Sequence, residues 1–302
     1  MVRSALRRSL PQSPPELIIV QGDTSSALGG ALAARDLGIR LAHVEAGLRS
    51  HDPAQPWPEE ENRVAIDRLS DLLLAPTEQN AANLRRESLN GEIVVTGNSG
   101  IDALSAIVGP LPLKRRPWWL PRRGMRLLVT CHRRENWGSG LDQLAEALIA
   151  LAGDGIASDV VLPPNSSVTE RMVGLLGGHR LIRLIPPMSH PAMIAAIRTC
   201  DLILSDSGGM QEEAPALGIP LLVLREKTER PEALASESAV LVGTDAERIV
   251  ATVTRLRRHR RELNAMSRPC LPFGDGHASR RIAAHCLALL EEETESLQSA
   301  LA

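Results

Sequence analysis

The chain has 302 residues and a formal net charge of -2, and hydrophobic residues make up 43% of it. This apolar content is enough for one large or two medium globular domains. A nearly neutral chain has no bulk electrostatic attraction to nucleic acid or to an anionic membrane. Aromatic residues, at 2%, are too few to form base-stacking platforms. We therefore expect a soluble protein with neither nucleic-acid nor membrane partners.

The cysteine pattern and the N-terminus indicate a cytoplasmic protein. The four cysteines lack CxxC spacing, which predicts neither a metal site nor a disulfide framework. No stretch approaches about 18 consecutive apolar residues. The basic N-terminus leads into a proline-rich polar segment without the apolar core of a signal peptide.

Short apolar runs, each followed by a helix-length segment, recur along the whole chain. This rhythm predicts an α/β protein built on parallel sheets. The runs form a group of four and a group of six. The predicted strands are Leu17–Val20, Leu41–Val44, Leu72–Leu74, Ile93–Val95, Leu127–Val129, Val160–Leu162, Ile182–Ile185, Leu202–Leu204, Leu221–Leu224 and Val240–Val242.

A proline-rich, basic segment separates the two groups and predicts two doubly wound domains joined by a linker. Its basic run, Lys114–Arg116, could bind phosphates, but a solvated linker is the favoured interpretation. Ligands of doubly wound sheets bind at the carboxyl ends of the strands, so we expect the active site in the cleft between the domains. The predicted parts are an N-terminal domain (1–108), a linker (109–126), a second domain (127–275) and a C-terminal helix packing back toward the first domain (276–302).

The segment 202–214 combines a strand, a small polar turn with two glycines and a helix. The first helical turn of such a segment has free N–H groups that attract an anion, so Ser207, Gly208 and Gly209 predict a phosphate site. Glu213 follows roughly 9 Å further along the helix, about the distance from a diphosphate to its ribose. An ordinary glycine-containing turn with surface glutamates explains this sequence pattern equally well. No lysine follows the glycines, so the segment is no Walker A motif.

The segment 224–232 follows the next strand and lies at the same sheet edge. Arg230, with Pro231 at the start of a helix, would add positive charge to a diphosphate site. A salt-bridged surface loop is the alternative.

Acidic residues follow the first two predicted strands and begin the next helix. Asp23, Glu45 and Glu59 are three acids that could converge in one cleft, as general acid–base chemistry requires. Each of them alone could be a helix cap or a solvated residue, because helix N-termini favour negative charge.

His132 follows the first strand of the second domain. It could titrate near neutrality or donate a hydrogen bond to a developing charge, with Arg133 and Arg134 beside it. The neighbouring Cys131 suggests a Cys–His nucleophile. That interpretation is disfavoured, because adjacent residues in an extended segment point to opposite sides.

Nine motifs, in order from Leu17 to Leu290, resemble the non-hydrolysing UDP-N-acetylglucosamine 2-epimerases. They are QGDTSS, HVEAGLRS, PEEENR, TGNSGIDAL, TCHRRENWG, SDSGGMQEEAP, TERPEA, LVGTD and FGDGHASRRI. The resemblance implies a GT-B-like fold of two Rossmann-type domains with the active site in the cleft between them. It also implies interconversion of UDP-GlcNAc and UDP-ManNAc for polysaccharide precursors, by elimination and re-addition of UDP through 2-acetamidoglucal.

The resemblance further implies a UDP-sugar substrate, no metal or other cofactor, and a homodimer. By motif, the catalytic residues would be Asp23, Glu45, Glu59 and His132. The UDP-binding residues would be Ser207, Gly208, Gly209, Glu213 and Arg230.

The chain also departs from the family pattern. The family's N-terminal strand with its Gly-Thr-Arg-Pro-Glu turn has no counterpart, so the first domain is expected to be incomplete and to expose an apolar sheet edge. Met188, Met193 and Cys131 differ from the usual residues. A catalytically impaired UDP-binding remnant and a GT-B glycosyltransferase are therefore the alternatives to an active epimerase.

Overall fold

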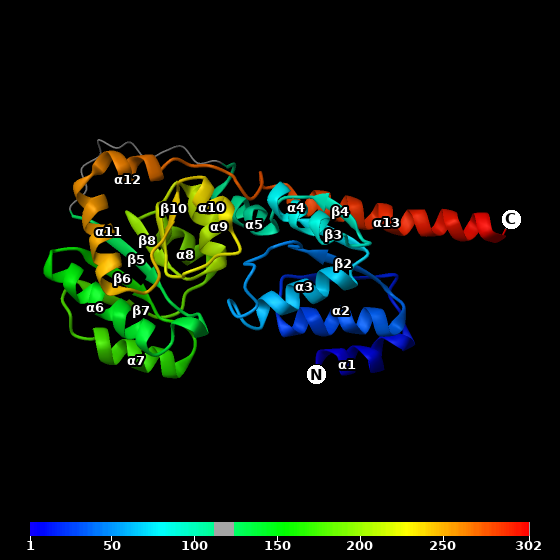
Figure 1. The fold of residues 1–302 in the computed structure, drawn as a ribbon, viewed down its shortest axis with the longest axis horizontal. Coiled ribbons are helices and arrows are strands. Elements are labelled where there is room, and N and C mark those ends of the chain that lie inside the picture. The colour runs from blue at the N-terminus through cyan, green and yellow to red at the C-terminus, as the bar shows by residue number, and fades with distance from the viewer. Residues whose placement is uncertain (112–123, 302) are drawn as a thin grey trace. The chain divides into compact units, whose positions relative to one another are not determined.

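The computed structural model describes residues 1–111 and 124–301 and divides the chain into two compact units. Unit 1 comprises Met1–Ala103 and Phe273–Ala302, and unit 2 comprises Leu104–Pro272. Each unit contains one parallel sheet (Figure 1). The sheet of unit 1 has four strands and the sheet of unit 2 has six. These strands occur where the sequence predicts them, and their ends differ from the predicted ends by up to three residues.

Unit 1 is built on a sheet of strand order β1-β2-β3-β4. The sequence continues from each strand into a helix, which is the connection that parallel pairing requires. The strands are β1 (Leu17–Gln21), β2 (Arg40–Val44), β3 (Leu72–Ala75) and β4 (Glu92–Val95). The helices are α1 (Val2–Ser9), η1 (Leu10–Gln12), α2 (Ser25–Leu37), α3 (Glu59–Leu69), α4 (Glu78–Arg86), α5 (Ser99–Val108), which continues into unit 2, and α13 (Ala278–Leu301).

Both faces of the unit 1 sheet are covered by helices. Strand side chains alternate between the faces, so Leu41 packs with Ala31 and Ile66 of α2 and α3, whereas Ala42 lies on the opposite face. On that opposite face, α13 packs against β2 and β3 through its apolar side. The α13 residues in this cluster are Ile282, Cys286 and Leu289.

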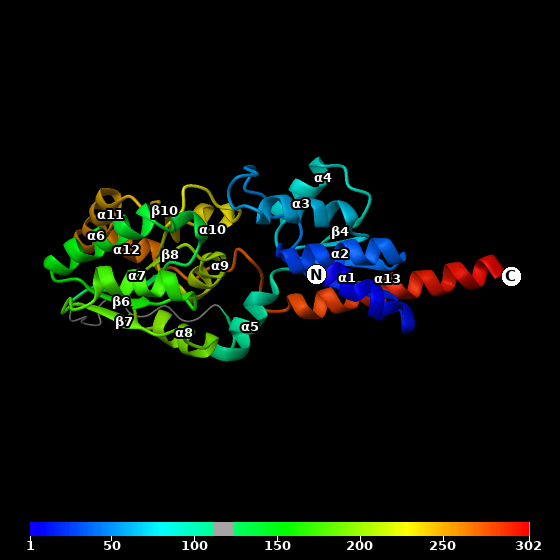
Figure 2. The same cartoon turned by 90° about the horizontal axis from the view of Figure 1, so that it is seen from below.

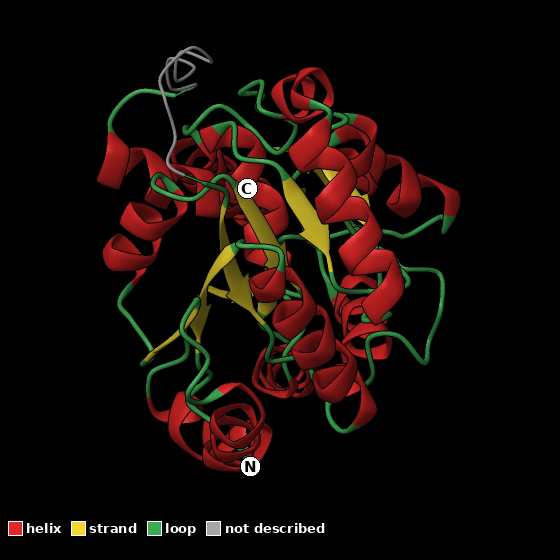
Figure 3. Cartoon of the chain, turned by 90° about the vertical axis from the view of Figure 1, so that its left-hand side faces the viewer, coloured by secondary structure: helices red, strands yellow, loops and turns green. Residues whose placement is uncertain are grey.

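Unit 2 is built on a sheet of strand order β10-β9-β8-β5-β6-β7. Helices lie on both of its faces (Figures 2 and 3). The strands are β5 (Arg126–Thr130), β6 (Ala157–Val161), β7 (Ile182–Ile185), β8 (Leu202–Ser205), β9 (Leu221–Val223) and β10 (Ala239–Leu241). The helices are η2 (Arg134–Asn136), α6 (Ser139–Gly153), α7 (Ser166–Leu176), α8 (His190–Ile197), α9 (Gly208–Leu217), α10 (Pro231–Ala235), α11 (Ala246–Arg258) and α12 (Arg260–Met266).

The segment between the two groups of strands is described only in part. Helix α5 ends at Val108 and β5 already begins at Arg126, where the sequence predicts the last linker residue. The basic linker residues Lys114, Arg115, Arg116, Arg122 and Arg123 lie outside the described residues. Within the described ranges, no helix is long and apolar enough to cross a membrane.

Strand β1 forms an edge of its sheet and carries an exposed apolar side chain. Ile19 retains 52% of its accessible surface. Unpaired N–H and C=O groups beside an apolar residue favour pairing with another chain.

We therefore expect Ile19→Lys to lower the concentration-dependent association of the protein, as measured by sedimentation velocity. Val173→Lys, at an exposed position on α7, is the control. Equal association of the Ile19→Lys variant and the unaltered protein would show that the β1 edge does not contribute to association.

Candidate functional site

Asp23 and Glu45 lie on adjoining turns at the carboxyl edge of the unit 1 sheet. The N–H of Gly22 donates to the carbonyl of Val44 at 3.1 Å, which joins the turn after β1 to the end of β2. A Cβ placed on Gly22 would lie 3.4 Å from Glu45 Oε2, so this carboxylate lies against the turn that carries Asp23. Glu45 has a φ of 73°, a left-handed conformation that non-glycine residues adopt mainly at sites under local constraint.

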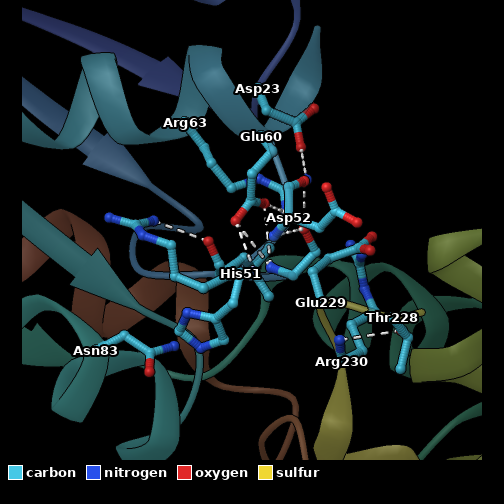
Figure 4. A network of polar contacts seen from close by, with 12 residues as sticks. Asp23, His51, Asp52, Glu60, Arg63, Asn83, Thr228, Glu229 and Arg230 are labelled. Carbon is cyan, nitrogen blue, oxygen red and sulfur yellow. Dashed lines mark hydrogen bonds and ion pairs between the residues drawn. The ribbon is translucent and has the colours of Figure 1, made fainter. Parts of the chain in front are cut away.

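Helix α3 joins these turns through Asn62 and Arg63. The guanidinium of Arg63 is buried and forms ion pairs with Asp23 and with Glu60, the latter at 2.8 Å (Figure 4). The amide of Asn62 donates to the backbone carbonyl of Asp23 at 2.8 Å. The side chain and backbone of Asp23 are therefore both held by contacts from α3.

Glu59 and Glu60 occupy the first turn of α3 but have different surroundings. Glu60 is buried and accepts from the backbone N–H groups of Ser50 at 2.9 Å and His51 at 3.1 Å. It therefore holds the loop after β2. Glu59 is half-buried in the same turn, and this turn is joined to Asp23 through Asn62 and Arg63. Glu60 and Arg63 were not among the predicted site residues, although their spacing of three residues in a helix brings them side by side.

A second, deeper network lies under the same turns. His43 Nδ1 lies 2.6 Å from Asp67 Oδ1, and Arg49 lies 2.7 Å from the other oxygen of Asp67. Arg49 also forms an ion pair with Glu87 at 2.7 Å. Burial alone would raise the pKa of Asp67, but His43 and Arg49 outweigh it and hold the pKa of this carboxyl below its ordinary value.

The segment 202–214 forms the predicted strand, turn and helix in unit 2. Helix α9 begins at Gly208, and the N-cap residue Ser207 makes no side-chain hydrogen bond to the first turn. A Cβ on Gly208 would lie 2.6 Å from Arg230 Nη1, so only glycine allows this guanidinium to approach the helix N-terminus so closely. An uncapped helix N-terminus beside a guanidinium favours a bound anion.

Arg230 is held by acidic neighbours. It donates from Nε to Glu212 Oε1 at 2.6 Å and forms an ion pair with Glu229, while its backbone N–H donates to Thr228 at 3.1 Å (Figure 4). Burial raises the pKa of Glu212, and the ion pair with Arg230 only partly opposes this rise. The guanidinium is therefore fixed in direction by several contacts before any ligand is present.

Asp206 organises the loop that carries His132. Its carboxylate is completely buried and accepts from the backbone N–H groups of His132 at 3.0 Å and Arg133 at 2.8 Å, and from the amide of Asn136 at 3.0 Å. His132 Nδ1 lies 3.2 Å from Asp206 Oδ1, while about half of the His132 side chain is exposed. A carboxylate at Nδ1 favours the tautomer with its proton on that nitrogen and leaves Nε2 for other partners.

Glu213 has a partner that the sequence analysis missed. His190, at the start of α8, lies 2.6 Å from Glu213 Oε1 through Nε2. Burial raises the pKa of Glu213, against the lowering effect of His190. No short-range spacing reveals this pair, because the residues are 23 positions apart and belong to different helices.

The Cys131–His132 nucleophile interpretation receives no support from the geometry. Cys131 is buried, whereas the side chain of His132 is half-exposed. Burial, together with the nearby Asp206, raises the pKa of the Cys131 thiol well above its ordinary value. A thiolate, the reactive form, is therefore disfavoured. In the described part of the chain, no group of three or more His, Cys, Asp and Glu residues could hold a metal ion.

These features define an α/β protein of the GT-B-like class, with an acid cluster in one unit and an uncapped helix N-terminus beside a guanidinium in the other. The family model described as UDP-N-acetylglucosamine 2-epimerase matches residues 2–287. The chain belongs to this family, so the family and the fold class predicted from the sequence are confirmed.

Individual relatives give the same result. The UDP-N-acetylglucosamine 2-epimerase of Escherichia coli K12 is 40% identical over 293 residues, which cover 93% of this chain and 78% of that protein. The crystal structure of UDP-GlcNAc 2-epimerase from Neisseria meningitidis bound to UDP-GlcNAc matches with a TM-score of 0.88 at 35% identity, covering 95% of this chain and 80% of that one. A UDP co-structure from S. aureus matches with a TM-score of 0.87 at 34% identity, covering 96% and 80% of the two chains.

The buried Asp206 leads to a stability prediction. Asp206→Asn removes a carboxylate oxygen that accepts hydrogen bonds in the interior, so we expect the free energy of unfolding to fall by about 2–3 kcal/mol. Asp142→Asn is the matched control, because the Asp142–Arg171 ion pair is solvent-exposed and its loss should cost less than about 1 kcal/mol. Urea denaturation of both variants measures the difference. Equal unfolding free energies would contradict the role given to Asp206.

The thiols are expected to differ in reactivity. Cys131, Cys200 and Cys286 are buried and Cys270 is half-buried, and burial raises the pKa of Cys286 as well as that of Cys131. A colorimetric thiol reagent should therefore react first with Cys270 in the folded protein. The fast phase should vanish in Cys270→Ser and persist in Cys131→Ser. Loss of the fast phase in Cys131→Ser would restore the nucleophile interpretation.

Proposed function

We propose that this chain is a UDP-N-acetylglucosamine 2-epimerase that interconverts UDP-GlcNAc and UDP-ManNAc for polysaccharide precursors. The observation that carries the proposal is the uncapped N-terminus of α9 with the Arg230 guanidinium beside Gly208. The N–H groups of the first turn and this guanidinium would bind the diphosphate. Glu213 would accept hydrogen bonds from the ribose hydroxyls and exchange its contact with His190 for them.

The acids of unit 1 supply the second part of the proposal. A carboxylate removes the proton from sugar C2, a double bond forms between C1 and C2, and the C1–oxygen bond breaks with its electron pair leaving on UDP. UDP then adds back to the 2-acetamidoglucal, and C2 receives a proton on the opposite face. Asp23, Glu45 and Glu59 are the proposed acid–base residues. Arg63 would hold the Asp23 side chain in a fixed direction.

His132 is proposed to stabilise the leaving group, the diphosphate of UDP. In its imidazolium form, His132 can donate from Nδ1 to Asp206 and from Nε2 to an oxygen of the departing diphosphate. A hydrogen bond to negative charge that increases in the transition state lowers the barrier. Ser207, Gly208 and Gly209 would bind the same diphosphate through the first turn of α9.

The acid cluster favours an epimerase over a GT-B glycosyltransferase, because it combines Asp23 and Glu45 with the cation of Arg63 in unit 1. We propose in addition a homodimer located in the cytoplasm. The dimer follows from the family resemblance. The cytoplasmic location agrees with the four cysteines, which form no disulfide bond in the described part of the chain.

The decisive experiment is incubation of the chain with UDP-GlcNAc in D2O. We expect UDP-ManNAc to form and deuterium to enter at C2, both followed by proton NMR. UDP binding without epimer formation would support the UDP-binding remnant. Transfer of the sugar to an acceptor would support the glycosyltransferase.

The acid assignment has its own test. Asp23→Asn removes a proposed acid–base group and should lower kcat by about 10²–10⁴-fold, while UDP binding measured by calorimetry stays unchanged. Asp159→Asn, which breaks only the surface ion pair with Arg183, is the control. Normal turnover of Asp23→Asn would show that the assignment is wrong.

A further inference from the structure

His43 lies beneath the two acid-bearing turns of unit 1 and has a hydrogen-bond partner at each ring nitrogen. It belongs to β2 and is completely buried. Nδ1 lies 2.6 Å from Asp67 Oδ1, and Nε2 lies 3.0 Å from the backbone carbonyl oxygen of Gly22. Both distances are those of hydrogen bonds.

The chemistry of these partners determines where the protons lie. A backbone carbonyl can only accept, so Nε2 must carry a proton. A carboxylate also only accepts, so Nδ1 must carry one too. The alternative is a neutral imidazole with a protonated Asp67. Asp67 instead lies against a cation, because Arg49 contacts its second oxygen at 2.7 Å, and that oxygen also accepts from the N–H of Gly47 at 3.2 Å.

The charge balance of the network leads to the same assignment. Asp67 and Glu87 are two carboxylates, and Arg49 is joined to both of them. Removing charges from water is costly unless they are paired. The network is neutral only when His43 supplies the second positive charge. The depressed pKa of Asp67 agrees with this distribution.

The same contacts tie together the turns that carry the proposed acids. The His43 bond reaches the carbonyl of Gly22, the residue before Asp23. The Asp67 bond reaches the N–H of Gly47, two residues after Glu45. Gly47 has a φ of 81°, and a Cβ there would lie 2.4 Å from the carbonyl oxygen of Asn80, so this turn packs closely against α4 and accommodates only glycine.

We propose that His43 is a buried imidazolium that, with Asp67, positions the turns bearing Asp23 and Glu45 for proton transfer. This inference rests on the proposed function of those acids. His43 and Asp67 are positioning residues, since their hydrogen bonds reach the backbone of the turns. A catalytic acid must be held to within a fraction of an ångström, and a displacement of about 1 Å can cost up to roughly 10²-fold in rate.

The protonation state is tested on the unaltered protein. With ¹⁵N-labelled histidine, both ring nitrogens of His43 should be protonated at neutral pH and show one-bond coupling to a proton. His43→Gln identifies the signals by their loss. A deprotonated Nδ1 at neutral pH would overturn the imidazolium. This readout does not depend on epimerase activity, so it separates the inference from the proposed function.

The positioning role is tested by a split between kcat and binding. His43→Gln can keep at most one of the two bonds, and we expect kcat to fall by about 10- to 100-fold with unchanged calorimetric affinity for UDP. Asp67→Asn should act in the same way. His259→Gln, at an exposed position in unit 2, is the matched control. Wild-type kcat in a folded His43→Gln variant would overturn the positioning role. Absence of epimerisation by the unaltered chain would instead contradict the proposed function.

Discussion

Parallel strand pairing is the constraint on which the site chemistry of both units depends. A parallel pair requires a crossover, so all strands of each sheet end at the same edge. In unit 1, the neighbours β1 and β2 bring the turns of Asp23 and Glu45 together. In unit 2, β5 pairs with β8 in a register that places Thr130 opposite Ser205, and the loops of His132 and Asp206 follow directly. The chemistry of each unit thus gathers at one edge, although its residues are far apart in the sequence.

Buried ionic contacts then fix the turns at these edges. Arg63 holds Asp23, the pair His43–Asp67 lies beneath it, and Asp206 holds the loop of His132. Such contacts add little net stability compared with a well-packed apolar core, but the loss of one partner is costly. Each of these contacts joins a turn or loop at the carboxyl edge of its sheet to a buried side chain.

Most of the fold could be predicted from the sequence, because apolar runs and helix-length segments alternate throughout. All ten strands have their predicted places, including the segment 202–214 with its strand, turn and helix. Asp23, Glu45 and the glycine turn could be selected because they follow strand ends, and Glu59 because it begins a helix. Arg63, Asp67 and His190 were missed as partners. Arg63 and Asp67 lie within helix α3. The identity of a charged residue in a helix does not show whether its side chain points to solvent or into the core.

The α/β class, the order of strands and helices, the family and the residue types available for chemistry all follow from the sequence alone. These depend on local periodicity and on motifs of a few adjacent residues. The contacts of Arg230 with Gly208, of His190 with Glu213 and of His43 with its two acceptors emerge only in the folded chain. The physical reason is that the direction and charge of a side chain depend on the atoms that surround it. Those atoms come from segments that the sheet brings together.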